Sequence, residues 1–393
     1  MARGGLTALL PVLSLGLVLV TSGALSPGGA VPATQLAASA SWKSVAPPSG
    51  AGSHGDLNGI ACPGLSSCWA VGDGSNGSTL LIEAYRGGNW TTESSPNPTD
   101  PTTGAVLQAY LYGISCPSTT DCWAVGDYND AGNIPLLEQY NGAGWTIVPG
   151  PSGGTPPFYQ ASLRGVSCVS SSDCWAVGFS NTLGTLVEQY NGSSWSIVPS
   201  PNAGQAREDQ LEGISCPSAA SCWAVGYQDY VGNSGSGKPL VLGYQGSGWT
   251  VVGAANPRPE SGTFLNSVSC SSASSCWAAG DLGPRKYKGR SLDQEPLLEE
   301  LQGGSWRTSQ QTSKGGGYLY QVGCLSSSSC FAVGSNNAQH SLIERRAGGS
   351  WVPQALAGGG LTSIACQSEG GCWAVGVGAA RANPPVLLLH YPG

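Results

Sequence analysis

The stretch Cys168-Val-Ser-Ser-Ser-Asp-Cys-Trp-Ala-Val-Gly178 decides the fold, because a version of it occurs seven times along this chain of 393 residues. Each copy has two cysteines separated by five residues, an aromatic residue directly after the second cysteine, and a glycine three residues later. The first cysteines of successive copies are 42 to 54 residues apart. A repeat of this length that is rich in strand-forming residues is typical of a β-propeller, in which each repeat forms one blade.

The cysteines predict a disulfide in every repeat. All 14 cysteines belong to these pairs, and no histidine lies beside any of them. Strict pairing of this kind indicates a disulfide framework in an oxidising compartment, whereas a zinc site needs a second pair or nearby histidines. We therefore expect no metal and no cofactor. The predicted bridges are Cys62–Cys68, Cys116–Cys122, Cys168–Cys174, Cys216–Cys222, Cys270–Cys276, Cys324–Cys330 and Cys366–Cys372.

The third repeat shows how one blade is built. Strand patterns cover 163–168, 174–178, 185–190 and 195–198, and Asn191-Gly192 favours a hairpin between the last two. The disulfide spans the first hairpin, and closing so small a loop stabilises by about 2 kcal/mol. The Trp after the second cysteine is expected to pack between blades. The sequence thus predicts an all-β, seven-bladed propeller with four antiparallel strands per blade and blades at roughly 57–98, 111–151, 163–202, 211–257, 265–311, 319–355 and 361–393.

The last repeat lacks its fourth strand. It ends at Leu387-Leu-Leu-His-Tyr391-Pro-Gly393, where the other repeats continue into a strand that contains Trp. The missing pattern occurs near the front of the chain, because Ser41-Trp-Lys-Ser-Val-Ala-Pro47 resembles Ser194-Trp-Ser-Ile-Val-Pro199. We predict that a strand within 41–48 completes the last blade, which closes the ring and removes the open sheet edges that favour aggregation.

Residues 1–40 are predicted to be a signal peptide. Arg3 precedes an uncharged apolar run over 6–20, and Ala38-Ser-Ala40 fits a cleavage site, with Ala24 as an alternative. The run is short for a membrane span, although an uncleaved anchor remains the rival interpretation. Residues 41–393 would then be a secreted or cell-surface propeller, expected to be monomeric, with no membrane span after signal removal. A net charge of −7 argues against nucleic-acid binding, which needs a basic surface.

Loop lengths predict which face of the propeller carries function. The turn between the two cysteines always has five residues, whereas the loops at the other end of the blades vary in length and composition. Function is usually found in variable loops on a rigid scaffold. The longest such loop, in the fifth blade, contains Arg285, Lys286, Tyr287, Lys288 and Arg290 and is a candidate site for an anionic ligand or else a solvated loop. Tyr227 and Tyr230 in the fourth blade form a smaller candidate.

One position near the start of each innermost strand varies while its neighbours do not. We call these the mouth residues, because their side chains are expected near the mouth of the central channel. Tyr112, Arg164, Glu212 and Tyr320 are the ligand-binding candidates among them. Arg164 and Glu212 belong to adjacent blades and are expected either to pair or to contact a ligand. The seven mouth residues are Asn58, Tyr112, Arg164, Glu212, Asn266, Tyr320 and Thr362.

A recurring acid occupies the third strand of five blades, at Glu83, Glu138, Glu188, Glu299 and Glu344. Since a catalytic acid need not repeat, these are expected to make hydrogen bonds or ion pairs within the fold. No catalytic residue is identified, because no Gly-x-Ser-x-Gly motif with a following acid and histidine is present.

The repeats resemble those of secreted bacterial β-propeller proteins. The resemblance rests on Gly113-Ile-Ser-Cys-Pro-Ser-Thr-Thr-Asp-Cys-Trp-Ala-Val-Gly126 and on Glu188-Gln-Tyr-Asn-Gly-Ser-Ser-Trp195, and it covers about 41–393. The chain is also distantly similar to the Asp-box propellers, which include sialidases and the photosystem II assembly factor. It departs from the Asp box, which has an acid five residues before its Trp, because Tyr stands there in most copies, as at Tyr190.

The function predicted from the sequence is therefore binding or scaffolding. An exported propeller would hold an extracellular ligand (a glycan, a peptide or a protein) on its variable-loop face. One alternative is a carbohydrate-active hydrolase or lyase that uses carboxylates on the same face, for which two acids at glycosidase spacing would be needed. The other is a purely structural cell-surface protein. Whether the protein is an enzyme stays open, with binding favoured.

Overall fold

The computed structural model describes residues 41–48, 55–74, 77–151, 160–204, 209–229, 237–259, 261–283, 293–309, 316–355, 358–367, 371–379 and 385–392, and the backbone of 286–287 and 290–291. All of them belong to one compact unit that runs from Ala40 to Gly393. The predicted signal peptide lies outside the described residues. In the described ranges, no helix is long and apolar enough to cross a membrane.

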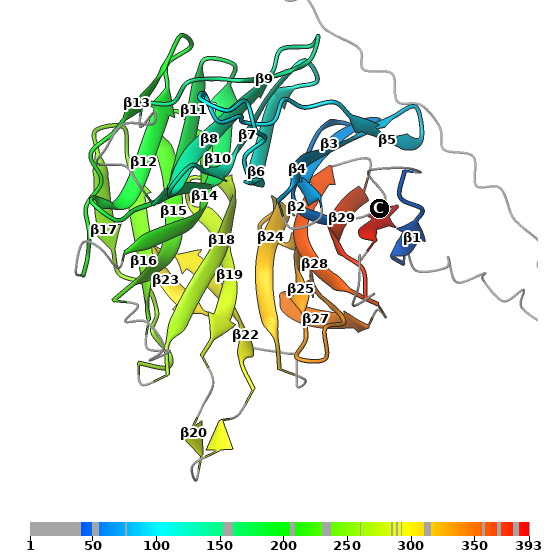
Figure 1. The fold of residues 1–393 in the computed structure, drawn as a ribbon. Helices are drawn as coiled ribbons and strands as arrows, with labels where there is room; N and C mark the ends of the chain where they lie inside the picture. Colours follow the sequence, from blue (N-terminus) through cyan, green and yellow to red (C-terminus); the bar gives the residue numbers. More distant parts are fainter. Residues whose placement is uncertain are drawn as a thin grey trace, which may run out of the picture. The chain divides into compact units, whose positions relative to one another are not determined.

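Seven four-stranded antiparallel sheets confirm the predicted propeller (Figure 1). Their inner strands contact one another in a closed cycle that runs from β2 through β6, β10, β14, β18, β24 and β28 back to β2. The blades, numbered from the N-terminal side, are as follows. Blade 1 comprises β2 (Asp56–Gly64), β3 (Ser67–Gly74), β4 (Thr79–Arg86) and β5 (Asn89–Glu93); blade 2 comprises β6 (Ala109–Ser118), β7 (Asp121–Asn129), β8 (Asn133–Tyr140) and β9 (Trp145–Ile147); blade 3 comprises β10 (Ala161–Ser170), β11 (Asp173–Ser180), β12 (Gly184–Tyr190) and β13 (Trp195–Ile197); blade 4 comprises β14 (Gln210–Ser218), β15 (Ser221–Gln228), β16 (Lys238–Tyr244) and β17 (Trp249–Val252). Blade 5 comprises β18 (Thr263–Ser272), β19 (Ser275–Leu282), β22 (Glu295–Gln302) and β23 (Ser305–Thr308); blade 6 comprises β24 (Tyr318–Ser326), β25 (Ser329–Ser335), β26 (Ser341–Ala347) and β27 (Ser350–Ala355); blade 7 comprises β28 (Gly360–Gln367), β29 (Gly371–Val377), β30 (Val386–Tyr391) and β1 (Lys43–Val45).

The predicted ring closure is confirmed. Strand β1 pairs antiparallel with β30, so that Lys43 faces His390 and Val45 faces Leu388, and Figure 1 shows β1 beside the C-terminal end of the chain. Trp42 is buried between the ring of Phe331 in blade 6 and the ring of Tyr391, with both ring centroids 5.5 Å away. Residues 42–45 therefore supply both the last strand of blade 7 and its packing against blade 6.

Aromatic side chains fill every seam between blades. The aromatic residue after the second cysteine of one blade packs edge-on against the Trp at or next to the start of the outer strand of the next blade, with ring centroids 5.0–5.6 Å apart. This confirms the inter-blade role expected for the repeated Trp. The Tyr that replaces the Asp-box acid joins the same packing in five blades, as Tyr190 does against Trp123. In blade 6 the guanidinium of Arg346 takes that place, 4.3 Å from the Trp277 ring centroid.

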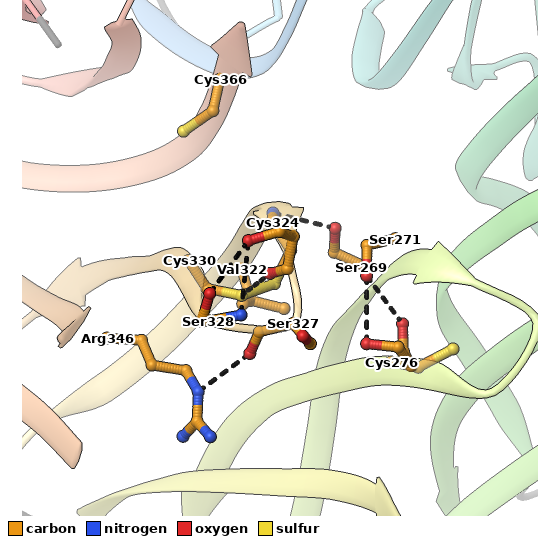
Figure 2. The surroundings of a disulfide bond; sticks show 12 residues. Ser269, Ser271, Cys276, Val322, Cys324, Ser327, Ser328, Cys330, Arg346 and Cys366 are labelled. Carbon is orange, nitrogen blue, oxygen red and sulfur yellow. Dashed lines mark hydrogen bonds between the residues drawn. A yellow bond between two sulfur atoms is a disulfide. The ribbon is translucent and has the colours of Figure 1, made fainter. Parts of the chain in front are cut away.

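One disulfide in each blade joins the inner two strands, with the Cα atoms 4.0–4.1 Å apart. Four seams carry a further bond next to these bridges, because a serine hydroxyl accepts the backbone N–H of the first cysteine in the next blade. Figure 2 shows the example of Ser269, whose Oγ lies 3.1 Å from the backbone nitrogen of Cys324. The repeated cysteine motif therefore links two strands within each blade by a disulfide, and in four seams the backbone N–H of its first cysteine also donates a hydrogen bond to a serine hydroxyl of the neighbouring blade.

The recurring acids are fully buried in the third strands. Glu83 accepts a hydrogen bond from Thr92 in the adjacent outer strand, and Glu138 accepts one of 2.7 Å from Ser95, which lies in the connection from the previous blade. Burial raises the pKa of Glu83, Glu138 and Glu299 to about 7 in each case. The expectation of hydrogen bonds within the fold is confirmed for Glu83 and Glu138.

Candidate functional site

Each mouth residue occupies a β-bulge on the innermost strand of its blade. In blade 3, for example, Leu163 pairs with Gly178 and Gly165 pairs with Val177, so Arg164 is an extra residue without a partner in β11. The same register shift recurs in all seven blades. A bulge re-aims a side chain that regular alternation would turn elsewhere. The fully buried leucine before each mouth residue fixes the register, as Leu163 does.

The glycine that ends each repeated phrase makes this bulge possible. A Cβ atom at Gly178 would lie 1.9 Å from the carbonyl oxygen of Ser162 on the inner strand, far inside van der Waals contact. Equivalent glycines in the other six blades would place a Cβ 1.8–2.1 Å from the corresponding carbonyl. Only a residue without a side chain allows the two strands to approach in this way, which explains the glycine in a phrase that otherwise builds the core.

All seven mouth residues line a single cavity of about 120 Å³, as the sequence predicted for their position. They lie near the first residues of the inner strands, at the end of the blades that carries the variable loops. Binding pockets for drug-sized ligands usually measure about 300–1,000 Å³. The cavity, which we call the mouth cavity, therefore has room for a few waters or for one small chemical group of a larger ligand.

Three mouth residues hydrogen-bond to the next blade around the ring. Asn58 donates to the backbone oxygen of Leu111 over 3.0 Å, and Asn266 donates to that of Leu319 over 2.9 Å. Thr362 donates to the backbone oxygen of Leu57. These side chains stabilise the seams as well as line the cavity.

Buried aspartates stand directly behind two of these side chains. The amide nitrogen of Asn58 also lies 3.3 Å from a carboxylate oxygen of Asp73, and that of Asn266 lies 3.3 Å from one of Asp281. Burial raises the pKa of both aspartates to about 6. Sequence reasoning missed this second layer, although its signal is a constant spacing of 15 residues from mouth residue to aspartate.

Tyr112, Arg164 and Glu212 form an interacting group across blades 2, 3 and 4. The guanidinium of Arg164 lies over the Tyr112 ring, 4.1 Å from its centroid. Burial opposes the charge on Arg164, but Glu212 and Tyr112 more than offset this effect, so the pKa of the guanidinium is raised. Burial raises the pKa of the Glu212 carboxyl, while Arg164 acts in the opposite direction. Burial also raises the pKa of Tyr112 to about 12.

The expected pairing of Arg164 with Glu212 is thus an electrostatic interaction without direct contact. Four ion pairs in the described part of the chain have N–O distances of 4 Å or less, and this pair is not one of them. Both side chains line the mouth cavity, and each interacts with a tyrosine as well, Arg164 with Tyr112 and Glu212 with Tyr227.

Tyrosine pairs stand in blades 2 and 6. Tyr110 and Tyr112 have nearly parallel rings with centroids 6.3 Å apart, and Tyr318 and Tyr320 are stacked at 5.9 Å. Tyr320 is 41 % exposed although it lines the cavity. It therefore offers an aromatic surface to anything that enters the mouth.

The remaining candidate residues from the sequence differ in where they lie and in how much of them the structure describes. Tyr227 interacts with Glu212 and donates a 2.8 Å hydrogen bond to Gln210, which places it beside the mouth cavity. Arg285, Lys288 and Tyr230 lie outside the described residues. For Lys286, Tyr287 and Arg290 only the backbone is described, as part of the two-stranded hairpin β20 (Lys286–Tyr287) and β21 (Arg290–Ser291), which Figure 1 shows beyond the ends of β19 and β22.

A buried arginine holds the base of that hairpin loop. Arg258, 7 % exposed, donates to the backbone oxygen of Gly283 at the start of the loop and forms an ion pair with Glu295 at its end. The loop is therefore anchored at both ends. In the described part of the chain, no group of three or more His, Cys, Asp or Glu side chains is arranged to hold a metal ion.

Comparison with solved structures places the chain among β-propellers. YCF48 from Cyanidioschyzon merolae aligns with a TM-score of 0.54 at 14 % identity over 90 % of this chain and 99 % of its own. A structure of YCF48 bound to D1 peptide aligns with a TM-score of 0.53 at 12 % identity over 90 % of this chain and 97 % of its own. An ulvan lyase of polysaccharide lyase family PL25, bound to -[GlcA(1-4)Rha3S]-, aligns with a TM-score of 0.55 at 9 % identity over 88 % of this chain and 95 % of its own.

These values show a shared fold. They confirm the distant similarity to photosystem II assembly factor propellers that the repeats indicated. No family model matches the chain, and no curated protein matches it.

Proposed function

We propose that this protein is an exported binding or scaffolding propeller that holds its ligand at the mouth cavity on the variable-loop face. The observation that carries the proposal is the convergence of seven bulged side chains on one cavity. Each blade has a bulge and a glycine that together present one side chain, and five different residue types occur at the seven positions. A channel that served packing alone would not need this variety at one repeated position.

The composition of the cavity favours binding over hydrolysis. Within the part of the chain that the structure describes, Glu212 is the only carboxylate that lines the cavity. A glycosidase needs two carboxyl groups about 5–10 Å apart on either side of the bond that is cleaved. Binding needs convergent polar groups and an aromatic surface, which the mouth residues supply. The solved propellers that resemble this chain in fold include one bound to a peptide and one bound to a saccharide, which fits a ligand of either kind.

Export is supported by the seven disulfides, because bridges of this kind persist in oxidising compartments outside the cytosol. The apolar leader of residues 1–40 agrees with this interpretation. The ligand would then be extracellular, as a surface glycan, a peptide or another protein.

The test is a binding screen of the purified protein on glycan and peptide arrays, repeated with Tyr320→Ala. We expect the variant to lose about tenfold or more in affinity, because a central aromatic side chain carries a large share of binding energy. The matched control is Val352→Ala, since Val352 is 48 % exposed on the outer strand of the same blade. A ligand that binds wild type and Tyr320→Ala equally, or the absence of any ligand, would contradict the proposal.

A further inference from the structure

The hydrogen bonds of the mouth residues define which atoms remain for a ligand. Asn58 uses its two amide hydrogens on the carboxylate of Asp73 and on the backbone oxygen of Leu111. Both partners are acceptors, so the amide orientation is fixed by them, and the side-chain oxygen of Asn58 is the atom left over. The same holds for Asn266, which donates to Asp281 and to the backbone oxygen of Leu319.

Two further mouth residues also offer acceptor atoms. The single hydroxyl hydrogen of Thr362 lies between the backbone oxygens of Leu57 and Val375, which leaves the lone pairs of the hydroxyl oxygen. Glu212 contributes a carboxylate, which in its ionised form can only accept hydrogen bonds. The aspartates behind Asn58 and Asn266 increase the effect, because chains of hydrogen bonds polarise one another.

Carboxyl groups outnumber cationic side chains in and directly behind the described lining of the cavity. Arg164 is the only cationic side chain among the described residues that line the cavity, and Glu212 offsets that charge. Behind the lining lie the buried carboxyl groups of Asp73, Asp127 and Asp281. Asp73 and Asp281 have a pKa of about 6 and are therefore ionised at neutral pH. The guanidinium of Arg164 lies over the Tyr112 ring and is stabilised by the charge of Glu212, while its Nε has no hydrogen-bond partner among the described residues.

We infer that the mouth cavity takes a primary ammonium group, as on an amino sugar or a lysine side chain. An ammonium has three donors and no acceptor, which complements a lining of amide, hydroxyl and carboxylate oxygens. The group is compact enough for a cavity of about 120 Å³. The exposed ring of Tyr320 adds the aromatic surface on which cations are favoured. This inference rests on the proposed function and narrows it to one ligand chemistry.

The experiment is calorimetric titration of the purified wild-type protein at neutral pH with matched probes. Glucosamine is compared with N-acetylglucosamine, and Nα-acetyl-lysine amide with its Nε-acetylated form, so that the two sources of the ammonium are distinguished. In at least one pair we expect the amine to bind about tenfold tighter or more, since acetylation removes a charge-assisted hydrogen bond. Equal affinity within both pairs, or no binding of either amine, would overturn the inference.

A variant locates the binding. Glu212→Gln keeps the shape and removes the charge, and we expect it to weaken amine binding about tenfold. Glu93→Gln, which removes a charge on the outer strand of blade 1, should leave binding unchanged. If Glu212→Gln binds the amines as tightly as wild type does, the inference is overturned. If this variant does not fold, the comparison of each amine with its acetylated form on the wild-type protein decides the question. A ligand from the arrays that depends on Tyr320 but is not displaced by either amine would sink the inference and leave the proposed function standing.

Discussion

Replacing the buried Glu138 by Gln should stabilise the protein at alkaline pH and hardly affect it in acid. Glu138 lies in β8 and is fully buried, and it accepts a hydrogen bond from Ser95. Burial raises the pKa of its carboxyl from 4.5 to about 7. The folded state thus holds a proton that the unfolded chain releases, so the free energy of unfolding falls as the pH rises from about 4.5 to about 7.

The magnitude follows from the size of that pKa difference. A shift of this size corresponds to about 3 kcal/mol of destabilisation above about pH 7, and to almost none below about pH 4. Glutamine has the same shape and no charge to bury, so Glu138→Gln should recover most of that free energy at about pH 8. With an unfolding entropy of about 2.1 cal/mol/K per residue, a ring of about 350 residues that unfolds as one unit would gain about 4 °C in Tm.

The assay is thermal unfolding of wild type and variant across a pH series, without reductant. Glu138→Leu is the matched control, because buried leucines (Leu242 and Leu389) occupy the equivalent position in blades 4 and 7. It should also stabilise at about pH 8. If Glu138→Gln lowered Tm by the same amount at all pH values, the carboxylate would be a net stabilising group, and the argument from burial would be wrong.

Three further outcomes test the architecture. Gly126→Ala should lower the free energy of unfolding in urea by about 3 kcal/mol or more, because a Cβ there would lie 1.8 Å from a backbone oxygen. The control Gly144→Ala, which has open space around it, should leave the stability unchanged. Equal effects of the two substitutions would count against the bulge. Trp42→Ala should lower the free energy of unfolding by about 3–5 kcal/mol, and Trp42→Phe by much less. A Trp42→Ala variant as stable as wild type would refute closure of the ring by β1. Intact mass should rise by 14 hydrogens on full reduction, and a smaller rise would exclude one bridge per blade.

The blades could be predicted because the evidence for them is repeated seven times. Each copy of the phrase independently indicates the same two strands and the same turn, so an ambiguity in one repeat is resolved by another. The closing strand was predictable for the same reason, since the pattern around Trp42 matches a piece that the last repeat lacks. The position of the mouth residues followed from comparing copies, because Arg164 and its equivalents differ where their neighbours agree.

The chemistry of the site was harder to predict. Alternation along a strand does not reveal a bulge, because the extra residue becomes visible only when the register with the partner strand is known. The layer of Asp73 and Asp281 behind the asparagines depends on that register, because each aspartate lies in the strand paired with the strand of its asparagine. The basic loop of blade 5 occurs in a single repeat, so no second copy exists against which its placement could be checked.

The bulge has a consequence for how this surface can change. Tyr112, Arg164, Glu212 and Tyr320 have no paired residue in the adjoining strand, so a substitution at these bulges leaves the strand register unchanged. Selection, or an engineer building a combinatorial library, can therefore vary these four positions at the expense of the contacts that the side chains make with one another and with Tyr110 and Tyr318, while the bridges and the buried leucines stay as they are. New specificities would be reached by altering a handful of codons rather than by rebuilding loops.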